Sequence, residues 1–192
     1  MGDLTFGYAL TGSFCTFEKN LQQIGYLVSK GINILPIMSF NAYKLDTRFG
    51  AAESFINRIE EITGNKIIHT ITAAEPIGPK SMLDLLIVSP CTGNTLAKLA
   101  YGVYDTPVTL AVKSHLRNQK PVLIGVSSND SLSSSGKNIG ALLNYKHYYF
   151  VPMRQDNPEG KPFSVVCDFE KIYDASLRAL NGQQIQPILV VS

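Results

Sequence analysis

The sequence predicts a three-layer α/β sandwich built around a mostly parallel sheet. Strand and helix patterns alternate over nearly all of the 192 residues, as they do when helices cover both faces of a parallel sheet. One strand candidate, Leu85–Val88, is apolar at every position, so we expect it to be buried on both faces. Because no internal repeat or linker is visible, residues 1–192 are expected to form a single domain of the Rossmann or flavodoxin-like type.

The first unit of the chain is predicted to be strand, helix, strand. Leu4–Leu10 has the length and apolar content of a strand. A helix is expected to follow, capped by Thr16 and ended by Gly31. Ile32–Met38 is a second apolar strand, and a helix between two strands predicts that they are parallel.

The next stretch leads to the centre of the sheet. Ala51–Thr63 has apolar residues at helical spacing and is followed by Gly64, which predicts a helix. Lys66–Ile71 is expected to be a short strand. Two prolines and a glycine exclude regular structure from Glu75–Lys80, and the central strand comes next.

A loop of small residues and another helix follow the central strand. This helix is expected to begin at Asn94. The next helix is predicted to start at Pro107, because proline suits the first turn, and to run to about Leu116. Pro121–Val126 is the next buried strand, and the serine-rich stretch 127–136 is expected to be a polar loop.

The C-terminal part is predicted to add smaller elements. Ile139–Leu143 is a short helix and His147–Val151 a strand. Met153–Pro162 is expected to be a loop, because it is polar and contains breakers. Asp168–Asn181 is the last helix, with Asp168 as its cap. The apolar tail, Pro187–Val191, is expected to pack on its own domain or on another protein chain.

The composition excludes several classes of partner. Hydrophobic residues make up 45% of the chain, charged residues 17%, and the net charge is only +2, so nucleic acid is not an expected partner. No apolar run approaches the roughly 20 residues of a membrane-spanning helix. Cys15, Cys91 and Cys167 are odd in number and lack the spacing of metal ligands, which favours reduced thiols in the cytoplasm and predicts no metal site.

Small and hydroxyl-bearing residues follow four of the predicted strands. The carboxyl ends of parallel strands share one edge of a sheet, where ligands bind. No Lys or Arg stands directly at these strand ends, and a helix start offers free N–H groups, so we expect a phosphate bound by neutral donors. No P-loop and no G-x-G-x-x-G is present, which favours a mononucleotide such as FMN. The candidate cofactor-binding residues are Thr11, Gly12, Ser13, Ser39, Pro90, Thr92, Gly93, Asn94, Thr95, Ser127 and Asn129.

The stretch Pro90–Thr95, Pro-Cys-Thr-Gly-Asn-Thr, resembles the Pro-Ala-Ser-Ala-Asn-Thr motif of the flavoprotein family. That family includes the homo-oligomeric flavin-containing cysteine decarboxylases and the prenyltransferases that use FMN. Further positions match its pattern: Thr11–Ser13, Ser39, Asp84, Ala97–Ala100, Gly102, Asp105 and Asn129. The resemblance implies a flavin site and a homo-oligomer, a trimer or larger.

Three longer stretches, ALTGSFCTFEK, SPCTGNTLAKLA and FVPMRQDNPEGKPFS, resemble one branch of this family. Members of that branch are one component of a two-component enzyme that oxidises a dihydropyridine dicarboxylate to a pyridine in endospore-forming bacteria. The resemblance implies an oxidoreductase component in the mother-cell cytoplasm, with a small dicarboxylate substrate. It also implies a dehydrogenase-like partner that brings NAD or NADP. A flavin or a nicotinamide can accept the two electrons involved.

Three residues are candidates for catalytic roles. Asn94 carries an amide at the expected helix start, close to any ligand bound there. Cys91 is either a redox-active thiol beside the cofactor or a small residue packed against it. Arg154 suits bidentate binding of a substrate carboxylate, or is a solvated charge in its loop.

The sequence also departs from the pattern of the decarboxylases. They carry a histidine in the segment before the motif strand, at a place that falls near Pro76 here, while His69 is seven residues earlier. Cysteine decarboxylation is therefore not expected. Two alternatives to the two-component enzyme stay open: a stand-alone FMN-dependent flavoprotein related to the decarboxylases, and a non-catalytic structural component.

Overall fold

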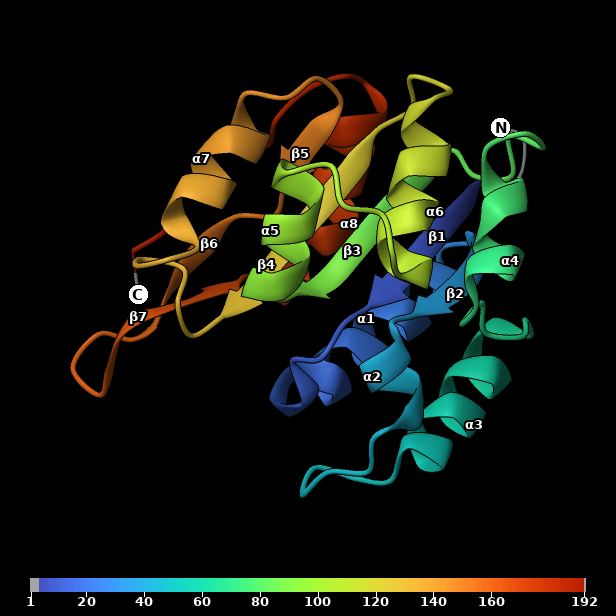
Figure 1. Ribbon diagram of the computed structural model, residues 1–192, viewed down its shortest axis with the longest axis horizontal. Helices are drawn as coiled ribbons and strands as arrows, with labels where there is room; N and C mark the ends of the chain where they lie inside the picture. Colours follow the sequence, from blue (N-terminus) through green and yellow to red (C-terminus); the bar gives the residue numbers. More distant parts are fainter. Residues whose placement is uncertain (1–3, 192) are drawn as a thin grey trace.

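The computed structural model of the chain describes residues 4–191 and shows a seven-stranded sheet (Figure 1). The strands are β1 Thr5–Leu10, β2 Asn33–Met38, β3 Leu85–Cys91, β4 Val122–Ser128, β5 Tyr148–Phe150, β6 Met153–Asn157 and β7 Lys161–Cys167. Their order is β2-β1-β3-β4-β7-β6, and β5 also pairs with β4. Strands β1 to β5 pair in parallel, and β7 pairs antiparallel with both β4 and β6, so the predicted, mostly parallel sheet is confirmed.

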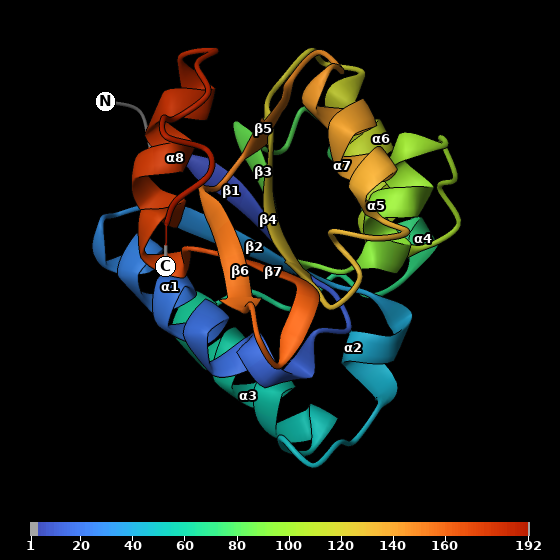
Figure 2. The same ribbon diagram turned by 90° about the vertical axis from the view of Figure 1, so that its left-hand side faces the viewer.

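Helices cover both faces of the sheet, which confirms the three-layer arrangement (Figure 2). They are α1 Phe17–Ser29, α2 Phe40–Lys44, α3 Ala52–Thr63, α4 Ile71–Ala74, α5 Gly93–Ala100, α6 Pro107–Leu116, α7 Gly136–Leu143 and α8 Ile172–Leu180. The core on one face lies under α1, α3 and α8, and the core on the other lies under α4 to α7. None of the helices in the described residues has the length and apolar content to cross a membrane.

Each face of the sheet has its own core because side chains alternate along a strand. Tyr8 points into the core under α1, and its neighbour Ala9 points into the other one. All residues of β3 are buried, as expected for an apolar run at the centre of a sheet. The predicted role of Leu85–Val88 as a strand buried on both faces is confirmed.

The strand order places a ligand-binding edge next to β1 and β3. After β1 the chain moves to β2 on one side and returns to β3 on the other, which makes a topological switch point. Leu10 lies beside Met38, and Cys91 lies beside Val126, so four strands end at the same edge. The candidate residues that follow these strands are therefore brought to one end of the molecule.

Several predicted elements are wrong. Lys66–Ile71 is not a strand, because only Ile68 pairs with the edge strand, in a single bridge to Ile37. Met153–Pro162 is not a loop, because the chain from Met153 to Cys167 forms the hairpin β6–β7. The short helix α2 was not expected at all.

The starts of three helices also differ from expectation. Helix α5 begins at Gly93 with Thr92 in the capping position, so Asn94 is already the second residue of the helix. Thr16 accepts no capping bond and instead donates its hydroxyl to the Ser13 carbonyl at 2.8 Å. Asp168 precedes a 3-10 turn, Phe169–Lys171, without capping it through its side chain. The tail packs on its own domain, where Leu189 bridges to Met153 on the edge of β6.

Candidate functional site

Two clefts open side by side at the carboxyl edge of the sheet. The first, which we call the α5 cleft, has a volume of about 440 Å³ and is lined by Thr11, Gly12, Ser39, Phe40, Asn41, Thr92, Asn94, Thr95, Lys98 and Thr106. The second, which we call the hairpin cleft, has a volume of about 710 Å³ and is lined by Gly12–Thr16, Lys19, Arg48, Phe49, Ser127–Asn129, Asp156, Lys161 and Ser164–Val166. Gly12 belongs to both, so the two clefts adjoin.

Thr11 ties together the loops that follow β1 and β3. Its buried hydroxyl donates to the carbonyl of Pro90 at 2.6 Å and accepts from the backbone N–H of Thr92 at 3.1 Å. A buried hydroxyl with both a donor and an acceptor partner holds its neighbours in fixed positions. The floor of the α5 cleft is therefore held rigidly before any ligand arrives.

The start of α5 presents unused donors to the α5 cleft. Thr92 occupies the capping position, and its hydroxyl lies 3.2 Å from that of Thr95 without bonding to the helix N–H groups. The backbone N–H of Gly93 donates to the Ser128 hydroxyl at 3.1 Å. Within residues 4–191 the N–H groups of Asn94 and Thr95 have no acceptor. They point from the positive end of the helix dipole, where an anion is stabilised.

A carboxylate network holds α5 against the serine-rich stretch after β4. Asp130 accepts hydrogen bonds from the hydroxyls of Ser128, Ser134 and Ser135, and these bonds lower its pKa. Gly93 packs against this network so closely that an added Cβ would lie 2.5 Å from Asp130 Oδ1. The serine-rich stretch, expected to be a polar loop, is thus held in place by hydrogen bonds to Asp130, and the glycine at position 93 lets α5 start against it.

Three residues that line the α5 cleft, Phe40, Asn41 and Lys98, are not among the site residues that the sequence predicts. Phe40 and Asn41 belong to α2, which is too short to show a helical period. Ser39 caps α2 by accepting from the Ala42 N–H at 3.3 Å, which leaves its own O–H free to donate. Lys98 lies one turn after Asn94, so the i, i+4 spacing was a signal that could have found it.

Lys98 is the one cation among the described residues that line the α5 cleft. Its ammonium group is 2.6 Å from the Asp105 carboxylate, and this hydrogen bond lowers the pKa of Asp105. The pair is partly exposed, so it adds little stability. The cleft is therefore mainly lined by neutral donors, with a single paired positive charge at its side.

The structure brings most of the predicted cofactor-binding residues together. Those that line the α5 cleft are Thr11, Gly12, Ser39, Thr92, Asn94 and Thr95. Those that line the hairpin cleft are Gly12, Ser13, Ser127 and Asn129. The hydroxyls of Ser13 and Ser127 are 2.8 Å apart, which joins the loops after β1 and β4. Pro90 and Gly93 are buried behind these loops and line neither cleft.

The other two candidates for a catalytic role lie outside both clefts. Cys91 is fully buried, and burial raises the pKa of its thiol, so it is a protonated core residue. Arg154 lies on β6 and lines a separate apolar groove of about 410 Å³ together with Leu132 and Leu189. Of the three, only Asn94 lines a cleft at the ligand-binding edge.

Comparison with known proteins places the chain in a family. The profile of the flavoprotein family matches residues 2–174, and the chain belongs to this family. It is 42% identical over 184 residues to the B subunit of dipicolinate synthase from Bacillus subtilis, and the match covers 96% of this chain and 92% of that protein.

Solved structures agree with this relationship. The B subunit of dipicolinate synthase from Bacillus halodurans superimposes with a TM-score of 0.91 and 41% identity, covering 98% of this chain and 97% of that one. The FMN-dependent cysteine decarboxylase SpaF superimposes with a TM-score of 0.67 at 20% identity, covering 93% and 97%. The likeness to SpaF concerns the fold alone.

Proposed function

We propose that this chain is the flavoprotein-like component of a dipicolinate synthase, acting with a dehydrogenase-like partner, the A subunit of that enzyme. Together they would oxidise dihydrodipicolinate to dipicolinate in the cytoplasm of the mother cell of a sporulating bacterium. Similarity over nearly the whole length to the B subunits of two Bacillus species supports this proposal. The observation that carries it is the pair of adjoining clefts at the switch point of a flavoprotein-family fold.

The α5 cleft fits FMN. The unpaired N–H groups of Asn94 and Thr95, with the hydroxyls of Ser39 and Thr92, suit a phosphate held by neutral donors. The hairpin cleft next to it, with Ser13, Ser127 and Asn129 in its lining, stays open for a second ligand. FMN bound in the α5 cleft would supply a two-electron acceptor.

The reaction removes a hydride and a proton from the dihydropyridine ring. NAD or NADP on the dehydrogenase-like partner, or a flavin held by this chain, would supply the acceptor for the hydride, and the proton would leave to solvent. The described residues contribute binding and orientation: Thr11 fixes the cleft floor, and Asn94 offers an exposed amide beside the free N–H groups of α5. The protonated Cys91 takes no part, since it lies in the core.

A decarboxylase related to SpaF is the second hypothesis, and the structure does not favour it. His69 is the histidine nearest in sequence to the motif strand on its N-terminal side. It lines neither cleft and stacks on Tyr43, with 3.8 Å between ring centroids. The histidine is thus engaged outside the two clefts.

The first test is the visible spectrum of the purified chain, with and without added FMN, after gel filtration. Flavin bands that stay with the protein support the cofactor site. A colourless protein that ignores FMN at micromolar concentration contradicts it.

The second test measures oxidation of dihydrodipicolinate by this chain, by its dehydrogenase-like partner, and by the mixture of the two. Activity confined to the mixture supports the two-component enzyme. Full activity of the partner without this chain contradicts a catalytic role for this chain.

A further inference from the structure

The hairpin cleft differs from the α5 cleft in its charge. Three cations line it, each from a different element: Lys19 from α1, Arg48 from the loop after α2, and Lys161 from β7. Lys161 is paired with Asp156 at 2.9 Å, and Asp156 is the one carboxylate among the lining residues that the structure describes. Within residues 4–191, Lys19 and Arg48 form no ion pair. The cleft therefore has two positive side chains that no carboxylate of the described chain neutralises.

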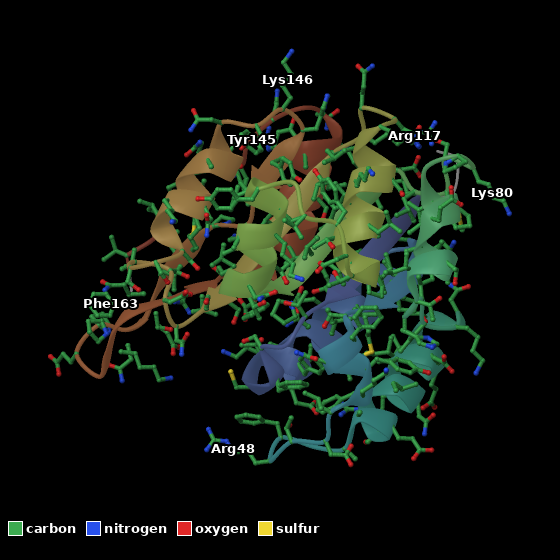
Figure 3. All side chains as sticks on the ribbon, viewed as in Figure 1. Arg48, Lys80, Arg117, Tyr145, Lys146 and Phe163 are labelled. Atoms are coloured by element: carbon green, nitrogen blue, oxygen red, sulfur yellow. The ribbon has the colours of Figure 1, made fainter. Side chains whose placement is uncertain are left out.

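The lining of the same cleft also includes two aromatic side chains, Phe14 and Phe49. Phe14 is half-buried, and Phe49 is 44% exposed at the mouth of the cleft. The Arg48 guanidinium carbon lies 4.9 Å from the centroid of the Phe49 ring, a cation–π arrangement that keeps it at the cleft. Figure 3 shows Arg48 extending from the loop between α2 and α3, at the end of the molecule where α1 starts. Ring faces and unpaired cations together suit a flat anion.

We propose that the hairpin cleft binds a planar ring with two carboxylates, and that Lys19 and Arg48 set this specificity by taking one carboxylate each. The choice of a pyridine dicarboxylate as ligand rests on the proposed function. Arg48 suits bidentate contact with a carboxylate, and Lys19 acts as a point charge. Because both clefts share Gly12, a ring bound here lies next to a ligand in the α5 cleft. This assignment replaces Arg154, which lies in another groove.

The test measures binding of pyridine-2,6-dicarboxylate to the full chain by titration calorimetry, with and without FMN. Pyridine-2-carboxylate, which has one carboxylate, serves as the comparison ligand. The parent is expected to bind one dicarboxylate per chain, and the monocarboxylate about tenfold more weakly, which is the loss of one charge-assisted contact. Lys19→Gln combined with Arg48→Gln is expected to weaken dicarboxylate binding by at least about thirtyfold.

The matched control is Lys80→Gln combined with Lys146→Gln. These lysines are exposed at the other end of the molecule, and their replacement removes the same net charge (Figure 3). The control is expected to bind the dicarboxylate within about twofold of the parent, since distant exposed charges are screened. A control that loses as much affinity as the Lys19 and Arg48 variant overturns the assignment, because the effect is then one of overall charge.

Two other results also overturn the inference: a parent that binds no dicarboxylate in either condition, and equal affinity for the two ligands. FMN retention, read from visible absorbance in the same samples, separates this inference from the proposed function. Binding of the dicarboxylate without FMN retention removes the cofactor proposal and keeps the cleft assignment. Retention of FMN without dicarboxylate binding keeps the cofactor proposal and removes the cleft assignment, and it places the substrate on the dehydrogenase-like partner.

Discussion

From the sequence, Asn94 could start helix α5, bind a ligand, or do both. Thr92 takes the capping position, so the exposed amide of Asn94 is not needed to start α5. Asn94→Ala is expected to weaken FMN binding by about tenfold, the value of one hydrogen bond to a charged group, while the melting temperature stays within roughly 2 °C. Fluorescence titration with FMN and thermal unfolding check this. Asn57→Ala, an exposed asparagine of α3, is the control, and equal FMN affinity of the two variants would falsify the site assignment.

His115 makes the stability of the chain depend on pH. Its Nε2 donates to the Pro121 carbonyl at 2.9 Å, its Nδ1 has no partner within residues 4–191, and burial lowers its pKa to about 4. Below pH 6.5 the unfolded chain takes up a proton that the folded chain refuses until about pH 4. The free energy of unfolding is therefore expected to fall by about 2 kcal/mol from this group between pH 7.5 and pH 5.

Urea unfolding at the two pH values measures this loss. His115→Gln is expected to remove it, so that the difference between the two pH values shrinks, whatever the variant does to stability at pH 7.5. His147→Gln serves as the control for replacing a histidine as such, because His147 is partly exposed between α7 and β5, and this variant is expected to keep the pH dependence that His115 causes. A His115→Gln protein with the same pH slope as the parent would show that His115 titrates normally.

At the scale of elements, the sequence predicts which strands are buried better than it predicts which segments pair in the sheet. The inner strands were predicted because an unbroken apolar run is what a strand covered on both faces needs. The strand β6 has only Met153 fully buried, so nothing in its composition distinguishes it from a loop, and its pairing with β7 alone makes it a strand. Lys66–Ile71 is the opposite case, a predicted strand that does not form. Ile67 and Ile68 are apolar, but only Ile68 pairs with the sheet, through a single bridge to Ile37.

The same reasoning explains which parts of the site were predictable. Residues directly after parallel strands, such as Thr11 and Ser39, were found because strand ends share an edge of the sheet. Lys19 and Phe40 carry no such signal, because helices α1 and α2 bring them to the clefts by three-dimensional packing. Arg154 was misplaced for the same reason: its strand lies at the edge of the sheet, and its side chain faces another groove.

Helix α5 depends on close contact with the segment after β4. A Cβ at Gly93 would lie 2.5 Å from Asp130 Oδ1 and 2.6 Å from Ser135 Oγ, so Gly93→Ala is expected to cost about 1–3 kcal/mol of stability and to weaken FMN binding. Gly140→Ala in α7 is the matched control, because no atom lies within 4 Å of its added Cβ. It should stabilise the chain by about 0.5–1 kcal/mol through helix propensity. Urea unfolding measures the change in stability of both variants. Equal changes for Gly93→Ala and Gly140→Ala would contradict the close contact at Gly93.

At the scale of the whole molecule, we expect a homo-oligomer, a trimer or larger. Large apolar side chains stay exposed where α5 and α7 end: Tyr101 is 66% exposed, Leu143 44% and Tyr145 46%. The Tyr145 hydroxyl donates to the Ala100 carbonyl, so these two ends form one surface. Exposed apolar surface of this kind is typical of contacts between protein chains. Sedimentation velocity at micromolar concentration tests the assembly, and Tyr101→Ser with Leu143→Ser should reduce its size while Leu45→Ser does not.

The two clefts also make a prediction about the stability of the folded chain. A ligand that binds only the folded state at 100 times its Kd raises the free energy of unfolding by about 2.7 kcal/mol. For a chain of 192 residues this corresponds to roughly 5–10 °C in melting temperature. Because FMN and pyridine-2,6-dicarboxylate are assigned to different clefts, their separate shifts should add when both are present. If the shift with both ligands equals the larger single shift, the two ligands compete for one site and the division into two clefts fails.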